Sequence, residues 1–115
     1  MHNVLIVGLG LIGGSYAKGL SKKGYNVFGI DKNIDTINLA YKEKVIKNNN
    51  NELNLFIKNI DIVILCLYPD DNVVWLKNNQ HLLNNNTLIT DVTGVKGKIV
   101  NDVKDFLRKD LIFIP

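Results

Sequence analysis

Three glycines near the amino terminus have a spacing that could hold a phosphate ligand. Gly8, Gly10 and Gly13 form a Gly-x-Gly-x-x-Gly sequence directly after the apolar run Val4–Val7. In such a sequence the first glycine permits a tight turn, the second lets a pyrophosphate approach the backbone, and the third lets a helix pack closely on the strand. The unpaired N–H groups at the start of that helix favour an anion. The residues expected to line this cradle are Gly8, Gly10, Leu11, Ile12, Gly13 and Ser15.

An acidic residue follows the glycines where a bound dinucleotide would present its adenosine ribose. Asp31 ends the next apolar run, Tyr25–Ile30, and a carboxylate at this point accepts hydrogen bonds from the ribose hydroxyls. Its charge would repel a 2′-phosphate, so NAD is favoured over NADP, although Lys32 would partly offset that repulsion. A strand-end turn or a helix cap is the alternative role for Asp31 taken alone. Because the acid and the glycines occur together, the sequence predicts an NAD site that includes Asp31 and Lys32.

The elements that must position these residues alternate between strand and helix. The predicted strands are Val4–Val7, Tyr25–Ile30, Ile62–Leu67, Thr87–Thr90 and Leu111–Ile114, with a short further strand at Val45-Ile46. The predicted helices are Leu11–Lys23, Asn33–Lys44, Glu52–Ile57, Pro69–Leu83 and Val95–Arg108. This alternation predicts an α/β fold, a doubly wound and mostly parallel sheet of the Rossmann type. Residues 1–115 are expected to form one dinucleotide-binding domain.

Composition sets limits on the class of protein. The chain has 115 residues, of which 46% are hydrophobic and 22% charged, as in ordinary globular domains. Its net charge of +3 comes from scattered lysines, which favours a solvated surface over a nucleic-acid site. Cys66 is the only cysteine, which fits a reducing compartment, and no membrane or targeting segment is apparent, so a cytoplasmic protein is expected. The asparagine clusters at 48–51 and 84–86 are interpreted as loop composition.

Other residues that could do chemistry have simpler interpretations. His81 is expected on the surface of a helix, and with only two histidines in the chain no metal site is predicted. Cys66 lies in the most apolar predicted strand, where a small core residue is favoured over a reactive thiol. Asp70 and Asp71 follow a proline at a helix start and suit the helix dipole better than a catalytic pair. Trp75 is expected to serve packing.

Three segments together resemble the prephenate/arogenate dehydrogenases of tyrosine biosynthesis. The sequence Val7–Ser15 resembles the glycine-rich segment of that family, including its Leu-Ile-Gly-Gly-Ser. The run Ile62–Pro69 resembles an apolar strand that ends in proline and whose loop lies against the cofactor. The segment Thr90–Lys96 resembles the Thr-Asp-x-x-Ser-x-Lys of the family. The resemblance therefore adds Leu67, Tyr68, Pro69 and Thr93 to the expected cofactor contacts.

The sequence of this chain differs from that of the family in two places. Gly94 stands where the family commonly has a serine that orients the catalytic histidine and the substrate, and Thr93 is the neighbouring hydroxyl that could replace it. Thr93 is thus the one catalytic candidate among these residues. The family's catalytic histidine follows the strand that matches Leu111–Ile114, which places it beyond Pro115. Its substrate-binding arginine and its helical dimerisation domain come later still, so the chain is expected to be the cofactor-binding part of a longer protein.

The resemblance implies a function for the complete protein. It would transfer a hydride from prephenate or arogenate to NAD with loss of CO₂, as a homodimeric NAD-dependent dehydrogenase. A histidine would accept the proton of the substrate hydroxyl. The 115-residue chain by itself is expected to bind NAD without turnover, because the base and the substrate clamp lie outside it.

Two alternatives share the glycine pattern. One is a regulatory NAD-sensing module of a potassium transporter, but such modules carry a Gly-Asp pair after the third strand, which Val45–Asn48 lacks. The other is a different small-substrate NAD(P) reductase, of the β-hydroxyacid or pyrroline-carboxylate type. The segment Thr90–Lys96 argues against both of these reductase types.

Overall fold

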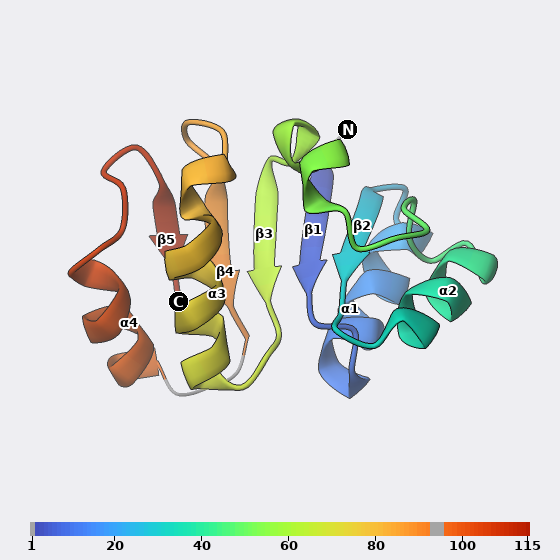
Figure 1. Cartoon of the computed structure of the whole chain (residues 1–115), viewed down its shortest axis with the longest axis horizontal. Coiled ribbons are helices and arrows are strands. Elements are labelled where there is room, and N and C mark those ends of the chain that lie inside the picture. Colours follow the sequence, from blue (N-terminus) through green and yellow to red (C-terminus); the bar gives the residue numbers. More distant parts are fainter. Residues whose placement is uncertain (1, 93–95) are drawn as a thin grey trace.

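A parallel sheet forms the centre of the molecule (Figure 1). The computed structural model describes residues 2–92 and 96–115. In this part of the chain the sheet has five strands in the order β2-β1-β3-β4-β5, and every neighbouring pair is parallel. The strands are β1 (Asn3–Val7), β2 (Asn26–Ile30), β3 (Ile62–Leu65), β4 (Leu88–Asp91) and β5 (Ile112–Ile114). The predicted α/β fold with a parallel sheet is confirmed.

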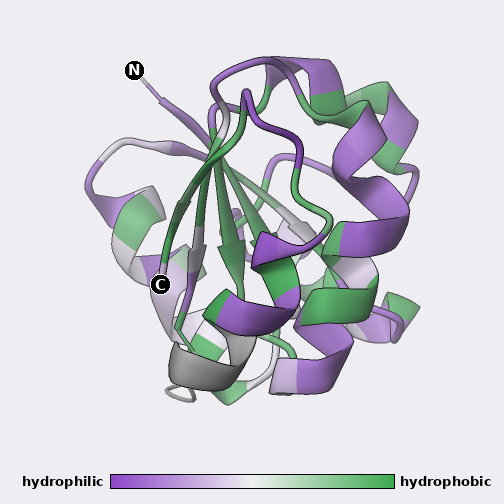
Figure 2. Ribbon diagram, turned by 90° about the vertical axis from the view of Figure 1, so that its left-hand side faces the viewer, coloured by the Kyte–Doolittle hydropathy of each residue, from purple (hydrophilic) through white to green (hydrophobic). Residues whose placement is uncertain are grey.

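Helices cover both faces of the sheet, as the edge-on view in Figure 2 shows. Ala17 of α1 and Ile37 of α2 belong to the apolar cluster on one face, whereas Leu76 of α3 and Val103 of α4 belong to the cluster on the other. The helices are α1 (Leu11–Lys22), α2 (Ile34–Lys42), α3 (Pro69–Asn79) and α4 (Lys96–Lys104). Short 3₁₀ helices are η1 (Leu53–Leu55), η2 (Ile57–Asn59) and η3 (Gln80–Leu82).

The strand β1 explains why both faces need cover. Leu5 and Val7 point into the cluster beneath α3 and α4, and Val4 and Ile6 point into the cluster beneath α1 and α2. All four side chains are at most 1% exposed. A strand buried on both sides is typical of the middle of a parallel sheet, and it holds the glycine turn that follows it in a fixed place.

The predicted strand at Val45-Ile46 is wrong. Ile46 is buried, but the N–H groups of Val45 and Ile46 both bond the Ala40 carbonyl, and only the following Lys47 N–H bonds the edge of β2, at the Val27 carbonyl 2.8 Å away. The side chain of Asn48 takes the place of the next backbone partner: it bonds the Gly29 N–H at 2.9 Å and the Gly29 carbonyl at 2.6 Å. Residues 48–51 lie in a loop as expected, but Asn48 is only 7% exposed and bonds the sheet edge, so it is not a solvent-exposed turn residue.

Several elements end at other residues than predicted: α1 and α2 end one and two residues early, at Lys22 and Lys42. The helix α3 ends at Asn79 rather than near Leu83, because Arg108 donates to the Gln80 carbonyl and its backbone N–H bonds the Gln80 side chain, so the chain turns there into η3. The strand β3 ends at Leu65 because the Leu67 backbone turns away to bond Asn72. The single helix predicted over Glu52–Ile57 is two short 3₁₀ turns, η1 and η2, and α4 ends at Lys104.

Candidate dinucleotide-binding site

The glycine turn after β1 is built so that two of its glycines cannot be replaced without movement. Gly8 has a φ of +95°, and a Cβ there would lie 2.8 Å from the Leu67 side chain. A Cβ on Gly13 would lie 1.8 Å from the Gly8 carbonyl oxygen, which keeps α1 pressed against the turn. A Cβ on Gly10 would meet nothing within 4 Å. Gly10 therefore leaves an open approach to the backbone on the side where a ligand would arrive.

The start of α1 differs from the starts of α2 and α3. Gly10 is the N-cap of α1, no side chain caps it, and its first turn holds no acid. By contrast, Asn33 caps α2, and the first turns of α2 and α3 contain Asp35 and the pair Asp70-Asp71. Uncapped N–H groups at the positive end of a helix, with no acid in its own first turn, suit an anion. Of these three helices, α1 alone is prepared to receive a phosphate.

The side chains at the start of α1 lie on the surface rather than in the hydrophobic core. Leu11 is 91% exposed and Ile12 is 51% exposed, so both present apolar surface at the cradle. The Ser15 hydroxyl donates to the Leu11 carbonyl at 3.0 Å, so its expected hydrogen bond to a phosphate would need that hydroxyl to turn away from the helix.

Asp31 is tied to the glycine turn and to the next helix. Its Oδ2 accepts from the Leu9 N–H at 2.8 Å, and its Oδ1 accepts from the Asn33 N–H at 2.9 Å. Leu9 itself is buried against Gly29, where a Cβ would lie 2.8 Å from the Leu9 side chain. These contacts hold the carboxylate beside the glycine turn, where the sequence predicts the ribose. The glycine inside strand β2 was the signal for this close contact, and sequence reasoning missed it.

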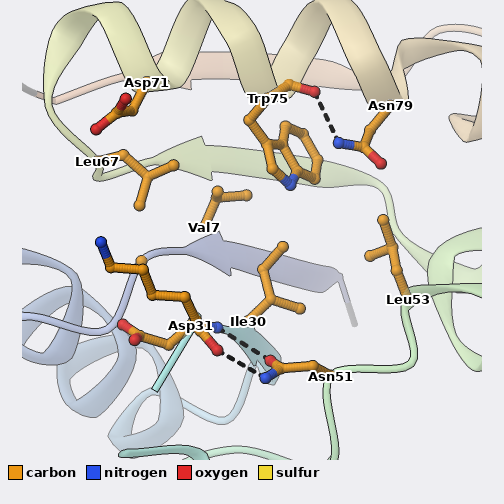
Figure 3. A pocket seen from close by; sticks show the side chains of 11 residues that line it. Val7, Ile30, Asp31, Asn51, Leu53, Leu67, Asp71, Trp75 and Asn79 are labelled. Atoms are coloured by element: carbon orange, nitrogen blue, oxygen red, sulfur yellow. Dashed lines mark hydrogen bonds between the residues drawn. The ribbon is translucent and has the colours of Figure 1, made fainter. Parts of the chain in front are cut away.

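A cavity of about 570 Å³ opens where β1, β2 and β3 end (Figure 3). Figure 3 shows the apolar side chains of Val7, Leu67 and Trp75 facing its interior, with Asp31 and Asp71 on opposite sides of one end. This is a common size for a small-molecule pocket, and it lies at the topological switch point, where parallel α/β sheets bind ligands. Its residues are Val7, Gly8, Ile30, Asp31, Lys32, Asn51, Leu53, Leu67, Asp71, Trp75 and Asn79.

A buried asparagine holds the loop that leaves β3. Asn72 is fully buried; its amide oxygen accepts from the Leu67 N–H at 2.9 Å, and its amide nitrogen donates to the Leu67 carbonyl and to Asp91 Oδ2, each at 3.1 Å. Asp91, at the end of β4, is 1% exposed. The amide thus joins the ends of β3 and β4. Sequence reasoning missed Asn72; its place one helical turn before the buried Leu76 is the only signal.

The remaining predicted contacts lie around this loop or outside the described residues. Leu67 is half-buried at the cavity, Tyr68 is 81% exposed, and Pro69 begins α3 as predicted. Lys32 is exposed at the cavity wall. Thr93 lies outside the described residues, together with Gly94.

Cys66 is not a candidate nucleophile. It follows β3 directly and is half-buried beneath the glycine turn, rather than inside the strand as predicted. Burial, and secondly the charge of Asp91, raise the pKa of its thiol to about 12. The thiol therefore stays protonated at neutral pH, which agrees with the small, unreactive residue that the sequence predicts.

Other chemistry has little support in the part of the chain that the structure describes. His81 is exposed on η3, as predicted. Among residues 2–92 and 96–115, no group of three or more histidine, cysteine, aspartate or glutamate side chains could hold a metal ion. None of the helices described there has the length and apolar character needed to cross a bilayer.

The parallel sheet, the glycine turn at its switch point and the acid at the end of β2 define a Rossmann-type dinucleotide-binding domain. The sequence pattern of the family described as prephenate dehydrogenase, nucleotide-binding domain, matches residues 16–115. The chain belongs to this family.

Individual relatives agree with this assignment. The chain is 33% identical over 114 residues to a prephenate dehydrogenase of Bacillus subtilis strain 168, a match that covers 96% of the chain and 31% of that protein. A crystal structure of prephenate dehydrogenase from Aquifex aeolicus in complex with hydroxyphenyl propionate and NAD⁺ matches with a TM-score of 0.85 and 31% identity, over 98% of the chain and 41% of the other. An arogenate dehydrogenase of Synechocystis matches with a TM-score of 0.83 and 26% identity, over 90% and 37%.

These matches bear on the alternatives as well. The predicted family, with NAD as its cofactor, agrees with the comparisons, which favour it over a transporter module. A 3-hydroxyisobutyrate dehydrogenase of Mycobacterium tuberculosis has a TM-score of 0.74 but only 16% identity, which shows a shared fold alone. The chain spans about a third of the Bacillus enzyme and two fifths of the Aquifex enzyme.

Proposed function

We propose that this domain binds NAD for a dehydrogenase that oxidises and decarboxylates prephenate or arogenate. The observation that carries the proposal is the pairing of an uncapped, acid-free helix start at Gly10 with a fixed carboxylate at Asp31, beside one cavity. This pairing matches a diphosphate joined to a ribose that carries no 2′-phosphate. Membership of the family and the NAD⁺ in the Aquifex relative support the same cofactor.

Different residues of this chain would bind different parts of the cofactor. The N–H groups at the start of α1 would bind the pyrophosphate, and Gly10 would let it approach. Asp31 would accept hydrogen bonds from the ribose hydroxyls, and the cavity lined by Leu67 and Trp75 would exclude water from the adenine. Lys32, Tyr68 and Pro69 stay candidate contacts at the edge of this site.

Bound NAD would supply the hydride acceptor, so the protein must supply orientation and a base. Neither His2 nor His81 lines the cavity as the structure describes it, and the family resemblance puts the base beyond Pro115. Thr93, two positions after Asp91 in the sequence, stays the candidate hydroxyl for the substrate. We therefore expect the 115-residue chain to bind NAD without oxidising prephenate, and the complete protein to be a homodimer with activity.

Titration calorimetry and a turnover assay test the two parts of this proposal. NAD should release heat on binding to the purified chain, and Asp31→Ala should weaken binding by roughly tenfold or more, since a hydrogen bond to a charged group contributes about 1.5–3 kcal/mol. Reduced cofactor should not form with prephenate or arogenate. Absence of NAD binding would refute the cofactor assignment, and measurable oxidation by this chain would refute the placing of the base outside it.

A further inference from the structure

The strand β2 is an edge strand whose outer side is closed by side chains instead of another strand. Its inner side pairs with β1; for example, the Asn26 N–H bonds the His2 carbonyl and the Ile30 carbonyl accepts from the Gly8 N–H. Because successive residues of a strand bond on alternate sides, Val27, Gly29 and Asp31 face the free edge. Unpaired backbone groups there would be a liability for the fold.

Residues 47–51, here termed the asparagine clamp, bond all three of these edge residues. The Lys47 N–H bonds the Val27 carbonyl, and the Asn48 amide bonds both the N–H and the carbonyl of Gly29. The Asn51 amide does the same for Asp31: its Oδ1 accepts from the N–H at 3.1 Å and its Nδ2 donates to the carbonyl at 2.6 Å. An asparagine amide has the donor and acceptor of a peptide group, so these side chains imitate a neighbouring strand.

The two asparagines of the clamp differ in their surroundings. Asn48 is buried, so its bonds belong to the fold. Asn51 is exposed, and water could replace its bonds at little cost to folding. Asn51 nevertheless bonds the backbone of the residue that carries the ribose-binding carboxylate, and it lines the same cavity, as Figure 3 shows.

The contacts continue from Asn51 through Asp31 to the glycine turn. The Asp31 backbone is held by Asn51, and its two carboxylate oxygens reach the Leu9 and Asn33 N–H groups. A rotation of the Asp31 backbone would move both oxygens together. Without Asn51, the Asp31 backbone loses its partner on the outer side of β2, and the carboxylate is held by the Leu9 and Asn33 N–H groups without a fixed backbone behind it.

We propose that Asn51 is a positioning residue for dinucleotide binding. By holding both backbone groups of Asp31, it fixes the carboxylate that receives the ribose hydroxyls, and it thereby sets the affinity for NAD and the preference for NAD over NADP. This inference rests on the proposed cofactor site, and it gives the exposed part of the asparagine clamp a role in specificity rather than in folding.

The test is a double-mutant cycle read with both dinucleotides. Calorimetry would measure NAD and NADP binding to the parent chain, Asn51→Ala, Asp31→Ala and the double variant. We expect Asn51→Ala to weaken NAD binding about fivefold to tenfold and to change NADP binding less than twofold, because Asp31 opposes a 2′-phosphate. In the Asp31→Ala chain, Asn51→Ala should change NAD binding less than twofold. The control is Asn54→Ala, at an exposed asparagine of η1, which should bind NAD like the parent.

The contrary results of these experiments would refute different parts of the inference. Equal losses for NAD and NADP, or the same loss of NAD binding without Asp31, would show that Asn51 does not act through the carboxylate. The urea midpoint of Asn51→Ala should match that of the parent chain. If the alanine chain unfolds, Asn51→Ser keeps a polar side chain too short to bridge both backbone groups, and unfolding of both would assign Asn51 to folding. If the parent chain binds neither dinucleotide, the proposed function itself fails.

Discussion

At the scale of single residues, the three glycines of the turn have separate physical reasons. Gly8 adopts a positive φ, Gly13 sits against the Gly8 carbonyl, and Gly10 faces open space. The first two requirements come from the chain itself and would exist without a ligand. An added Cβ at Gly10 would meet nothing within 4 Å, which is compatible with the proposed approach of a pyrophosphate to the backbone.

This difference predicts opposite results for two alanine variants. Gly13→Ala should lower the free energy of unfolding by about 3 kcal/mol, because backbone must move to admit the methyl group. Gly10→Ala should leave the urea midpoint near that of the parent but weaken NAD binding roughly tenfold or more, because the methyl group occupies the approach of the pyrophosphate. Urea unfolding and calorimetry on both variants distinguish the two effects. Unchanged NAD binding by Gly10→Ala would contradict the assigned approach.

Cys66 gives a prediction about pH. The thiol has a pKa of about 12 in the folded chain against an ordinary value of 9.0, so it should react far more slowly with a disulfide reagent at pH 8 than the same chain in urea. Between these two pKa values only the unfolded chain loses the proton, so this group lowers stability as pH rises from about 9 to about 12. A folded-state reaction as fast as that of the unfolded chain would refute the raised pKa.

At the scale of elements, asparagine side chains recur where strands end. Asn48, Asn51 and Asn72 each bond both backbone groups of one residue: Gly29, Asp31 and Leu67 respectively. Two of these pairs hold the end of β2, and the third holds the exit of β3 on the other side of the cavity. The walls of the site are therefore fixed by side chains that no strand or helix pattern predicts.

Removing a buried member of this set should destabilise the fold. Asn48→Ala leaves the N–H and carbonyl of Gly29 buried without their partner, and we expect the free energy of unfolding to fall by about 2–3 kcal/mol. Asn54→Ala, at an exposed position, should change it by less than about 0.5 kcal/mol. Urea unfolding measures both. Equal stabilities of the two variants would show that water replaces Asn48 at the strand edge.

At the scale of the whole molecule, the site exists because three strands end side by side. The turns after β1, β2 and β3 come from residues 8, 31 and 67, which are distant in sequence and border one cavity. A ligand that joins these turns adds contacts that the unfolded chain lacks. Binding should therefore stabilise the folded domain.

A thermal unfolding experiment measures this coupling. NAD at 100 times its dissociation constant should stabilise the chain by about 2.7 kcal/mol. For a domain of this length, that corresponds to a rise in Tm of about 10 °C. NADP at the same concentration should give a smaller rise, because Asp31 opposes its 2′-phosphate. An equal rise with both would contradict the assigned role of Asp31.

The sequence alone determined the parallel α/β fold, the glycine turn and the acid at the end of β2. These features are local: apolar runs of strand length, helix periodicity and glycine spacing depend on neighbours within a few residues. The family resemblance also needed only the order of three short segments. For the same reason the start of α3 at Pro69 and its two acids were predicted correctly.

Only the tertiary structure decided what holds the site in place. The false strand at Val45-Ile46 and the roles of Asn48, Asn51 and Asn72 depend on partners 5 to 20 residues away along the chain. An asparagine in a loop has the same local pattern whether its amide meets water or an edge strand. The choice is made by which backbone groups the folded sheet leaves unpaired, and those groups exist only after the strands have come together.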